Sequence, residues 1–355
     1  MVRPRKLREF IGRLKDNASL IKANLTTKRT VSSIKIAILR ATSHSSTAAP
    51  PEHQLDAILS LGHDVHLPLA CACVEAVLDR LHNTRSPYVA LKCLFILHNI
   101  ITHGSFILKE QLSFYPLTGG QNSLKLTRFS NKSNLENWEL SQWVRWYASV
   151  LERNLITTRI LGCYLCCTSS SSKFQENRNN KIAIRPPDCD LLKEIDSLVC
   201  MVEGICAAPE SLHYQRLDLV HEFMLLVSED YRFTQHQIIT RLNELGDRTA
   251  RMSYDDSAEL ICCLKRLEDC RMRLVEMFAN RKRNDEFWDL VRQTRVGLEE
   301  LNEKRDRGRM VVWKGWQDET TELTRFVDQR VMGTSEVIKL SPCRSQWLTV
   351  SAAVA

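Results

Sequence analysis

Apolar residues recur along most of this chain at steps of three and four positions, which is the period of an amphipathic α-helix. Near the N-terminus the pattern joins Leu7, Phe10, Ile11 and Leu14 on one face, and Lys and Arg fall mostly off that face. Further along, the same spacing predicts helices over 31–44, 53–61, 66–83, 86–104, 105–113, 138–168, 188–207, 210–228, 231–249, 253–280, 283–305 and 318–331. The predicted fold class is therefore all-α, with short turns that build a bundle or an α-solenoid.

Breaks in this pattern divide the chain into parts. Residues 168–187 are rich in Ser, Asn and Arg and end in two prolines, so we predict a flexible linker there. We expect a basic amphipathic segment over 1–30 and a helical solenoid core over 22–160. A C-terminal helical part over 188–331 and an irregular tail over 332–355 complete the predicted organisation.

The composition agrees with a helical, globular chain. Only 12 Gly and 10 Pro occur in 355 residues, which is few for folds that depend on tight turns. With 44% hydrophobic residues, the chain is also unlike a disordered or low-complexity protein. The 13 cysteines are scattered and odd in number, and no signal peptide precedes them, so we expect a cytosolic protein without a disulfide framework. No apolar run approaches the roughly 18 residues needed to span a membrane.

Positive charge is concentrated at the N-terminus. The formal net charge is +7, and residues 1–40 contain 11 Lys or Arg but only two acidic residues, Glu9 and Asp16. The rest of the chain is therefore close to neutral. A basic end of this kind suits an anionic partner, and each Lys or Arg near an anionic bilayer contributes about 1 kcal/mol.

The basic N-terminal helix leaves several interpretations open. Leu7, Phe10, Ile11 and Leu14 can form a membrane-insertion face at a bilayer interface. The same face also suits an ordinary helix that packs on the protein body. The segment is basic, poor in acids and rich in Ser and Thr, which also fits a transit peptide that is removed on import. A solvated basic terminus without a partner is the fourth interpretation.

Signatures of catalysis and of metal binding are missing from the sequence. It contains neither a GxxxxGK(S/T) nor a GxGxxG motif, and His221-Glu222 lacks the second His of a zinc-protease helix. Cys163 and Cys166 form a CxxC without a second ligand pair. Trp143 and its aromatic neighbours have core-like spacing and no basic groove around them. We therefore expect no enzyme activity, no cofactor, no metal and no nucleic-acid partner.

Three stretches resemble the ANTH domain of plant-type, CALM-like clathrin assembly proteins in the ENTH/ANTH superfamily. Residues 36–44 are IAILRATSH, 92–104 are KCLFILHNIITHG and 138–148 are WELSQWVRWYA. The similarity extends over residues 1–160, and fewer motifs support it from 188 to 331. It implies an ANTH-type α-solenoid of paired helices that continues into a helical bundle.

The resemblance implies an endocytic adaptor that binds phosphatidylinositol 4,5-bisphosphate, recruits clathrin and contacts a vesicle SNARE helix. Such a protein is cytoplasmic and peripheral, on plasma-membrane clathrin-coated pits, clathrin-coated vesicles and the Golgi. Carried over by position, the family's phosphoinositide-binding residues correspond to Arg40 and His53. To these we add other basic residues nearby, namely His44, Lys28, Arg29 and Lys35.

Two features depart from the family pattern. Pro50 and Glu52 stand where relatives carry basic residues, and a carboxylate beside phosphates weakens their binding. The sequence also lacks DPF, NPF and clathrin-box motifs. Asp190-Leu191-Leu192 matches a clathrin-binding tripeptide, but it stands where a helix start is predicted. The alternative function is a helical-repeat protein-interaction scaffold with weakened lipid and clathrin binding.

Overall fold

The structure is a computed structural model that describes residues 4–24, 29–44, 47–60, 67–114, 124–165, 187–210, 217–246, 248–278 and 285–307. Every regular element within these ranges is helical, which confirms the all-α prediction. The chain divides into two compact units, residues 1–302 and 303–355, and the second is described only over 303–307. The predicted tail 332–355, the predicted helix 318–331 and all of the predicted linker except Pro187 lie outside the described residues.

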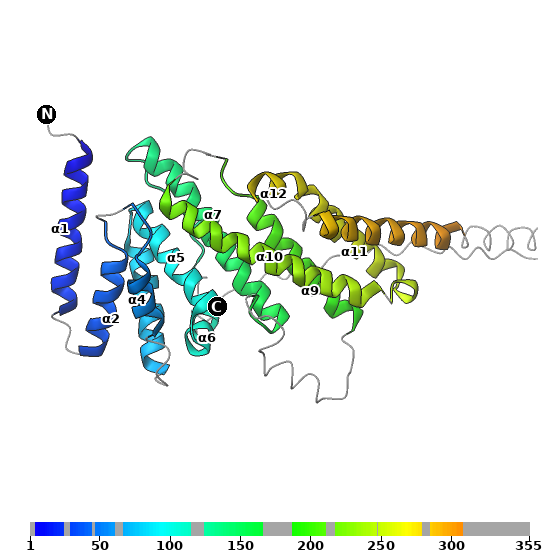
Figure 1. Cartoon of the computed structure of the whole chain (residues 1–355), viewed down its shortest axis with the longest axis horizontal. Helices are drawn as coiled ribbons and strands as arrows, with labels where there is room; N and C mark the ends of the chain where they lie inside the picture. Colours follow the sequence, from blue (N-terminus) through cyan, green and yellow to red (C-terminus); the bar gives the residue numbers. More distant parts are fainter. Residues whose placement is uncertain are drawn as a thin grey trace, which may run out of the picture. The chain divides into compact units, whose positions relative to one another are not determined.

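The first unit begins with six helices (Figure 1). These are α1 (Pro4–Asn24), α2 (Arg29–Ala41), α3 (Glu52–Ser60), α4 (Leu67–Asn83), α5 (Pro87–His103) and α6 (Phe106–Phe114). The later elements are α7 (Leu135–Leu161), α9 (Asp188–Cys206), α10 (Asp218–Gly246), the short 3₁₀ helix η2 (Thr249–Arg251), α11 (Tyr254–Asp269) and α12 (Arg271–Met277). Residues 285–307 are also helical. None of the helices within the described ranges is long and apolar enough to cross a membrane.

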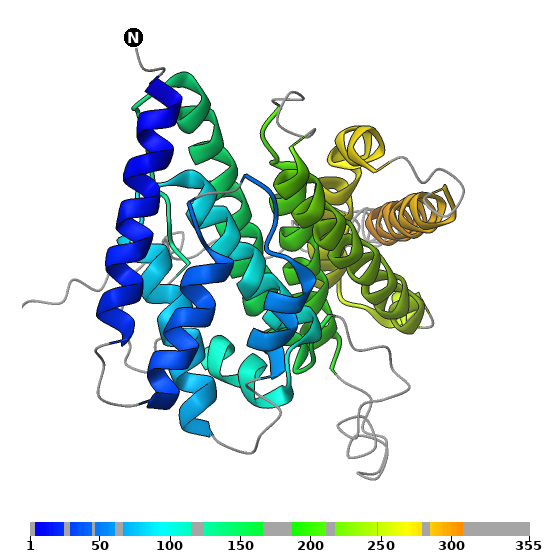
Figure 2. The same ribbon diagram turned by 60° about the vertical axis from the view of Figure 1, so that its left-hand side comes forward.

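Neighbouring helices in the sequence pack against one another in space. Helices α1, α2 and α4 run side by side in both views (Figures 1 and 2), and α4 in turn packs on α5. Helix α5 carries the packing onward to α7 and α10, and α9 contacts α7, α10 and α11. The N-terminal helices are thus layered on a central group formed by α5, α7, α9 and α10.

Helix α5 is buried along almost its whole length, from Val89 to Ile101. It starts at Pro87, whose fixed φ suits the first position of a helix. The aromatic residues of α7 and α10 form the adjacent core, in which the rings of Tyr147 and Phe223 stack with their centroids 4.4 Å apart. Trp143 is fully buried in the same core, as its spacing predicted.

A buried polar group joins α5, α7 and α10. The His98 ring donates from Nε2 to Oδ2 of Asp230 at 3.0 Å, and its Nδ1 lies 2.9 Å from the Tyr147 hydroxyl. Asn154 donates to the same Asp230 oxygen at 2.7 Å. All four side chains are buried, so these bonds replace the water that the groups lose on folding. The group ties the N-terminal layers to α10.

Two thiols lie inside the layers that α4 and α5 form. Cys73 of α4 and Cys93 of α5 are both buried. Burial disfavours the thiolate, and it raises the pKa of each thiol to about 12. Neither side chain is available to reagents while these helices stay packed.

Helix α10 corrects one sequence prediction. The predicted helices 210–228 and 231–249 are a single helix, Asp218–Gly246. The residues between the two predicted segments include no Gly or Pro, and Asp230, which lies there, is buried and hydrogen-bonded rather than exposed in a turn. The chain therefore continues through Asp230 as one helix.

The predicted long helix over 253–280 is wrong in the opposite sense, because it is broken at Cys270 into α11 and α12. Around the break the backbone N–H of Cys270 bonds to the carbonyl of Leu267, a tighter pairing than in an α-helix. Cys270 itself is buried. No Gly or Pro marks this position, so the sequence pattern carried no sign of it.

Candidate functional site

Helix α1 packs on α2 through its small and polar side. Gly12, Asp16 and Ala23 are buried in this region. A Cβ atom added to Gly12 would lie only 2.7 Å from Cβ of His44, so glycine permits the close approach of α1 to the segment that follows α2. At the other end of the contact, the Ser32 hydroxyl donates to the Ala23 carbonyl at 2.7 Å.

The apolar side of α1 faces away from the protein body. Phe10, Ile11 and Leu14 are 59%, 45% and 52% exposed, and Ile21 is also exposed. Because a helix turns about 100° per residue, this face lies roughly opposite the packed side. The interpretation in which Phe10, Ile11 and Leu14 pack on the body is therefore wrong. The side chain of Leu7, the fourth residue of the predicted membrane-insertion face, lies outside the described part.

Asp16 is the centre of the contact between α1 and the helices behind it. Its Oδ1 accepts from Nδ1 of His44 at 2.7 Å and from Arg80 at 2.8 Å, and its Oδ2 accepts from the His44 backbone N–H at 2.8 Å. Burial acts to raise the pKa of the Asp16 carboxyl, but the bonds from His44 and Arg80 together hold that pKa below its ordinary value. The carboxylate therefore stays ionised and joins α1 to α2 and α4.

A second polar layer lies behind Asp16. Arg80 also donates to the Thr42 carbonyl at 3.3 Å, and Lys92 of α5 donates to the Ser43 carbonyl at 3.0 Å. Burial lowers the pKa of Lys92 to about 8, although the Asp16 carboxylate acts in the opposite direction. We call Asp16, His44, Arg80 and Lys92 the polar junction.

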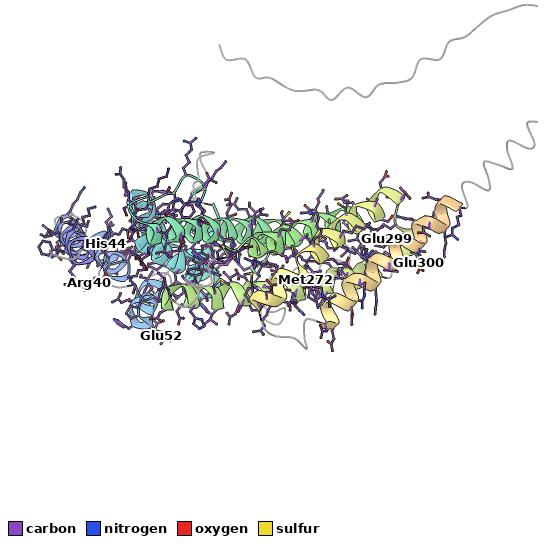
Figure 3. The ribbon with its side chains drawn as sticks, turned by 90° about the horizontal axis from the view of Figure 1, so that it is seen from above. Arg40, His44, Glu52, Met272, Glu299 and Glu300 are labelled. Carbon is purple, nitrogen blue, oxygen red and sulfur yellow. The ribbon has the colours of Figure 1, made fainter. Side chains whose placement is uncertain are left out.

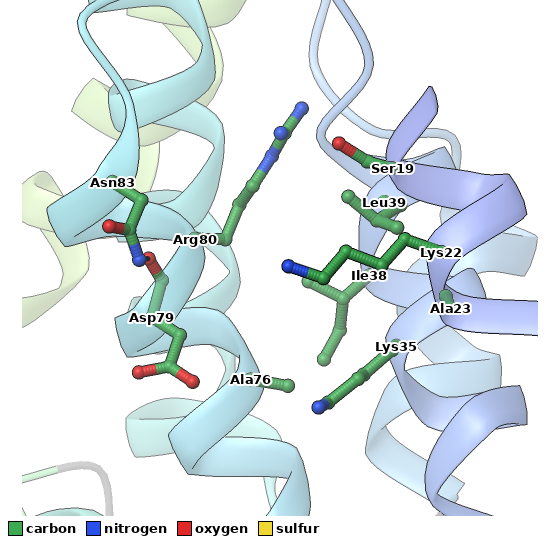
Figure 4. Close-up of a pocket in the computed structure, with 10 residues that line it drawn as sticks. All are labelled: Ser19, Lys22, Ala23, Lys35, Ile38, Leu39, Ala76, Asp79, Arg80 and Asn83. Carbon is green, nitrogen blue, oxygen red and sulfur yellow. Dashed lines mark hydrogen bonds between the residues drawn. The ribbon is translucent and has the colours of Figure 1, made fainter. Parts of the chain in front are cut away.

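A pocket of about 270 Å³ opens beside this junction, between α1, α2 and α4 (Figure 4). Its polar lining residues are Ser19, Lys22, Lys35, Asp79, Arg80 and Asn83. Ile38, Ala23 and Ala76 form an apolar floor. Figure 4 shows the ammonium groups of Lys22 and Lys35 extending from α1 and α2 toward α4.

The pocket has an excess of positive charge. Lys22 of α1 and Lys35 of α2 line one side, and Arg80 and one acidic residue, Asp79, line the side that α4 forms. The Arg80 guanidinium is already bonded to Asp16. Two convergent ammonium groups over an apolar floor suit a small anion that can accept several hydrogen bonds.

The structure distributes the predicted phosphoinositide residues over different environments. Lys35 lines the pocket, and Arg40 and His53 are exposed on α2 and α3. His44 is bonded to Asp16, which limits what it can offer to a ligand. Lys28 lies outside the described residues, as does the side chain of Arg29.

The two residues that depart from the basic pattern of the family, Pro50 and Glu52, lie in different environments. Pro50 is buried, and Glu52 is exposed in the first turn of α3. Figure 3 shows Arg40, His44 and Glu52 at one end of the first unit, far from Glu299 and Glu300. The basic end is thus separated from this acidic pair.

Sequence analysis missed Lys22, Asp79 and Arg80 as site residues. Lys22 was counted only as part of the basic segment. Arg80 sits in the last turn of α4 next to Asp79, and nothing in the spacing of α4 separates it from an ordinary exposed charge. The matching of these residues with Lys35 depends on helix packing, which spacing along the chain does not show.

The tripeptide Asp190-Leu191-Leu192 is part of helix α9. Leu191 and Leu192 are each only 2% exposed. This confirms the interpretation of the segment as a helix start, because both leucines are used in packing. A partner that recognises an exposed Asp-Leu-Leu segment cannot reach them in this fold.

These features define the class of the protein: an all-α domain of layered helices with a basic N-terminal end. The sequence pattern of the ANTH domain matches residues 33–283, and this chain belongs to the ANTH domain family.

Three proteins of Arabidopsis thaliana, each named for clathrin assembly, are similar over most of their length. The identities are 38% over 343 residues, 30% over 304 and 30% over 299. The alignments cover 95%, 83% and 81% of this chain and 93%, 87% and 97% of the three relatives, respectively. Together with the domain match, they confirm the resemblance seen in the three stretches quoted above.

Proposed function

We propose that this protein is a peripheral endocytic adaptor that docks on phosphoinositide-containing membranes and helps to recruit clathrin. The observation that carries the proposal is the exposed apolar face of α1, which lies opposite its packed side within a basic segment. The family and the names of the three relatives support the clathrin part of the proposal. The protein acts by binding rather than by catalysis.

Docking combines two forces that act at the same end of the molecule. The lysines and arginines of residues 1–40 attract anionic headgroups, each with about 1 kcal/mol near the surface. Phe10, Ile11 and Leu14 then enter the interface, where full burial of such a side chain contributes about 1.5–3 kcal/mol. Electrostatic attraction alone gives weak and reversible membrane binding. Insertion of the apolar face increases the affinity for the membrane.

The phosphoinositide headgroup is recognised by basic residues near this face. Arg40, His53 and Lys35 are accessible for this purpose, and Lys28 and Arg29 belong to the same basic segment. Arg40 can bind a phosphate with two parallel hydrogen bonds. His44 acts indirectly, because its bonds to Asp16 hold α1 in place.

Partners and location follow from this mode of docking. The protein works on the cytoplasmic side, at plasma-membrane coated pits, on clathrin-coated vesicles and at the Golgi. The helical surface behind the membrane-facing end is available for clathrin and for a vesicle SNARE helix.

Vesicle sedimentation tests the proposal. The double variant Ile11→Ser, Leu14→Ser should bind phosphatidylcholine vesicles containing phosphatidylinositol 4,5-bisphosphate at least about tenfold more weakly than the unchanged protein. Leu225→Ser is the matched control, because Leu225 is a similarly exposed apolar residue on α10. Equal binding of the unchanged protein to vesicles with and without the phosphoinositide would contradict the proposal.

The second candidate is a protein-interaction scaffold that has kept the fold with weakened lipid and clathrin binding. Pro50 and Glu52 favour it, since Glu52 is exposed where a carboxylate repels phosphates. An Arg40→Glu variant separates the two functions. Retained membrane localisation of this variant in cells favours the scaffold, whereas its loss favours the adaptor.

A further inference from the structure

Two cysteines meet where the last residue of α9 packs against the break between α11 and α12. Cys206 ends α9, and Cys270 is the single residue between α11 and α12. The Cys206 thiol donates to the Cys270 carbonyl at 3.9 Å, and the two thiols are also hydrogen-bonded to each other. Both cysteines are free thiols in this structure. Two residues that stand 64 positions apart in the chain are thus side by side in the fold.

Hydrogen bonds on both sides hold this contact in register. About one turn before it, Arg266 of α11 binds Glu203 of α9 through two parallel hydrogen bonds of 2.9 and 2.8 Å. Just after it, Arg273 of α12 donates to the Ala208 carbonyl at 3.0 Å. The backbone around the two cysteines is therefore held by contacts that involve neither thiol. Because a disulfide accepts only a narrow range of backbone separations, such a fixed register favours an intramolecular bond.

The two thiols differ in their access to solvent. Cys206 is partly exposed, whereas Cys270 is only 7% exposed. Burial, together with the neighbouring Cys206 thiol, raises the pKa of the Cys270 thiol to about 12. Cys270 therefore stays protonated at neutral pH, and a reagent from solvent meets Cys206 first. An accessible thiol with a second thiol beside it is typical of redox-sensing pairs.

We propose that Cys206 and Cys270 form a redox-controlled pair, which a peroxide converts into a disulfide that joins the end of α9 to the break between α11 and α12. The proposal goes beyond membrane docking and does not depend on it. It also agrees with the expected absence of a disulfide framework, because disulfides of reducing compartments are usually transient and redox-sensing.

The reaction takes place in two steps. The Cys206 thiol gives its proton to solvent, and the thiolate attacks one oxygen of hydrogen peroxide. The O–O bond breaks, a sulfenic acid forms on Cys206, and the hydroxide that leaves takes up a proton to become water. The Cys270 sulfur then attacks the Cys206 sulfur, and the S–O bond breaks as the sulfenic oxygen leaves with the Cys270 proton as a second water. Both thiols are oxidised and one peroxide is reduced, and a dithiol reductant reverses the change.

The disulfide should stabilise the C-terminal part of the described helices. It closes a loop across 64 positions that contains all of α10 and α11. Closure of a long loop restricts the unfolded chain and therefore favours the folded one. It also prevents the end of α9 from separating from the start of α12.

Peptide mass spectrometry of the full chain tests the proposal. The reduced protein is treated with hydrogen peroxide at low protein concentration, the remaining thiols are blocked with N-ethylmaleimide, and a tryptic digest is analysed without reduction. We expect residues 194–216 to be linked to residues 267–271 by a disulfide, and dithiothreitol should release the two peptides. Cys206→Ala should lose the linked pair completely.

Cys200→Ala is the matched control. Cys200 is the other cysteine of the peptide 194–216, and its thiol accepts a hydrogen bond from Arg266 at 3.2 Å rather than one from Cys270. This variant should form the linked pair as fully as the unchanged protein. Oxidation should also raise the Tm of the unchanged protein and of Cys200→Ala by at least about 5 °C, and it should leave the Tm of Cys206→Ala unaltered.

Three results would overturn the proposal. Peroxide may leave both thiols reduced, or it may oxidise Cys206 to a sulfinic acid without forming the linked pair. The pair may disappear in Cys200→Ala, in which case Cys200 rather than Cys206 is the partner of Cys270. Finally, a linked pair that forms without a rise in Tm contradicts the stabilising role of the bond. None of these results affects the proposed function, which vesicle sedimentation tests separately.

Discussion

Two regions of the described part hold their helices together by different means. Where α5, α7 and α10 meet, Trp143, Tyr147 and Phe223 are buried, and the polar atoms of His98 and Asp230 are enclosed among them. Where α1 meets α2 and α4, the contact consists of small residues and of the polar junction around Asp16. Apolar burial dominates the first region, and hydrogen bonds to charged groups dominate the second.

The difference shows how one chain can combine a stable helical core with an N-terminal helix that can detach from it. Burial of large apolar side chains does not depend on the ionisation state of any group. Hydrogen bonds to a carboxylate depend on its ionisation and on the presence of both partners. The large apolar residues of α1 are exposed, so the attachment of α1 to the protein body depends on the polar junction.

Trp143→Ala should have the largest effect on stability. Removal of a fully buried tryptophan costs about 3–5 kcal/mol, because it leaves a cavity in addition to the lost burial. Trp138→Ala on the same helix is the control and should cost about 0.5 kcal/mol or less, since Trp138 is 44% exposed. Urea unfolding measures both values. Similar losses for the two variants would mean that this core is not what holds the central helices.

Lys92 should make the stability of the polar junction depend on alkaline pH. Its pKa in the fold is about 8, below the ordinary value of 10.5, so the unfolded chain binds more protons between these two values. The free energy of unfolding should therefore rise with pH across that range, by up to about 3 kcal/mol relative to Lys92→Met. Parallel stability curves for the two proteins between pH 7 and 10.5 would contradict this expectation. Lys193→Met, at an exposed lysine, serves as the control.

Asp16→Ala should have a smaller and more local effect. The variant leaves Arg80 and the His44 backbone N–H without their carboxylate partner, which costs about 2 kcal/mol. Hydrogen exchange should become faster in α1 while α5 stays protected. In the unchanged protein the same contribution should be lost as the pH falls below about 4, because the pKa of Asp16 in the fold lies under its ordinary value of 3.8. Asp56→Ala, at an exposed acid on α3, should leave the exchange of α1 unaltered.

Much of the fold could be predicted from the spacing of apolar residues. The run in α5 and the aromatic spacing in α7 depend on local periodicity, and α5 occurs where it was expected. The helix predicted over 138–168 is also present, but it starts at Leu135 and ends at Leu161, where Gly162 adopts a left-handed conformation. The joining of two predicted helices into α10 and the break at Cys270 could not be predicted. No Gly or Pro marks either place, and Asp230 is held inside α10 by its contact with His98 of α5, far away in the sequence.

The candidate site was predictable only in its overall character. The concentration of lysine and arginine at the N-terminus pointed to an anionic partner. The pocket itself joins Lys22 and Lys35 to Asp79 and Arg80, which lie much further along the chain. Asp16 showed no sign in the sequence of being a buried partner for His44 and Arg80, because a lone acid in a basic helix is equally suited to solvent.

The buried thiols of α4 and α5 give the two regions a built-in chemical reporter. Cys73 and Cys93 are shielded and protonated at neutral pH while their helices remain packed. Cys189 and Cys262 are exposed, so we expect them to react with an alkylating reagent in the native state. A brief alkylation pulse followed by peptide mass spectrometry therefore measures how often α4 and α5 separate. Modification of Cys73 or Cys93 identifies molecules in which these helices were apart during the pulse.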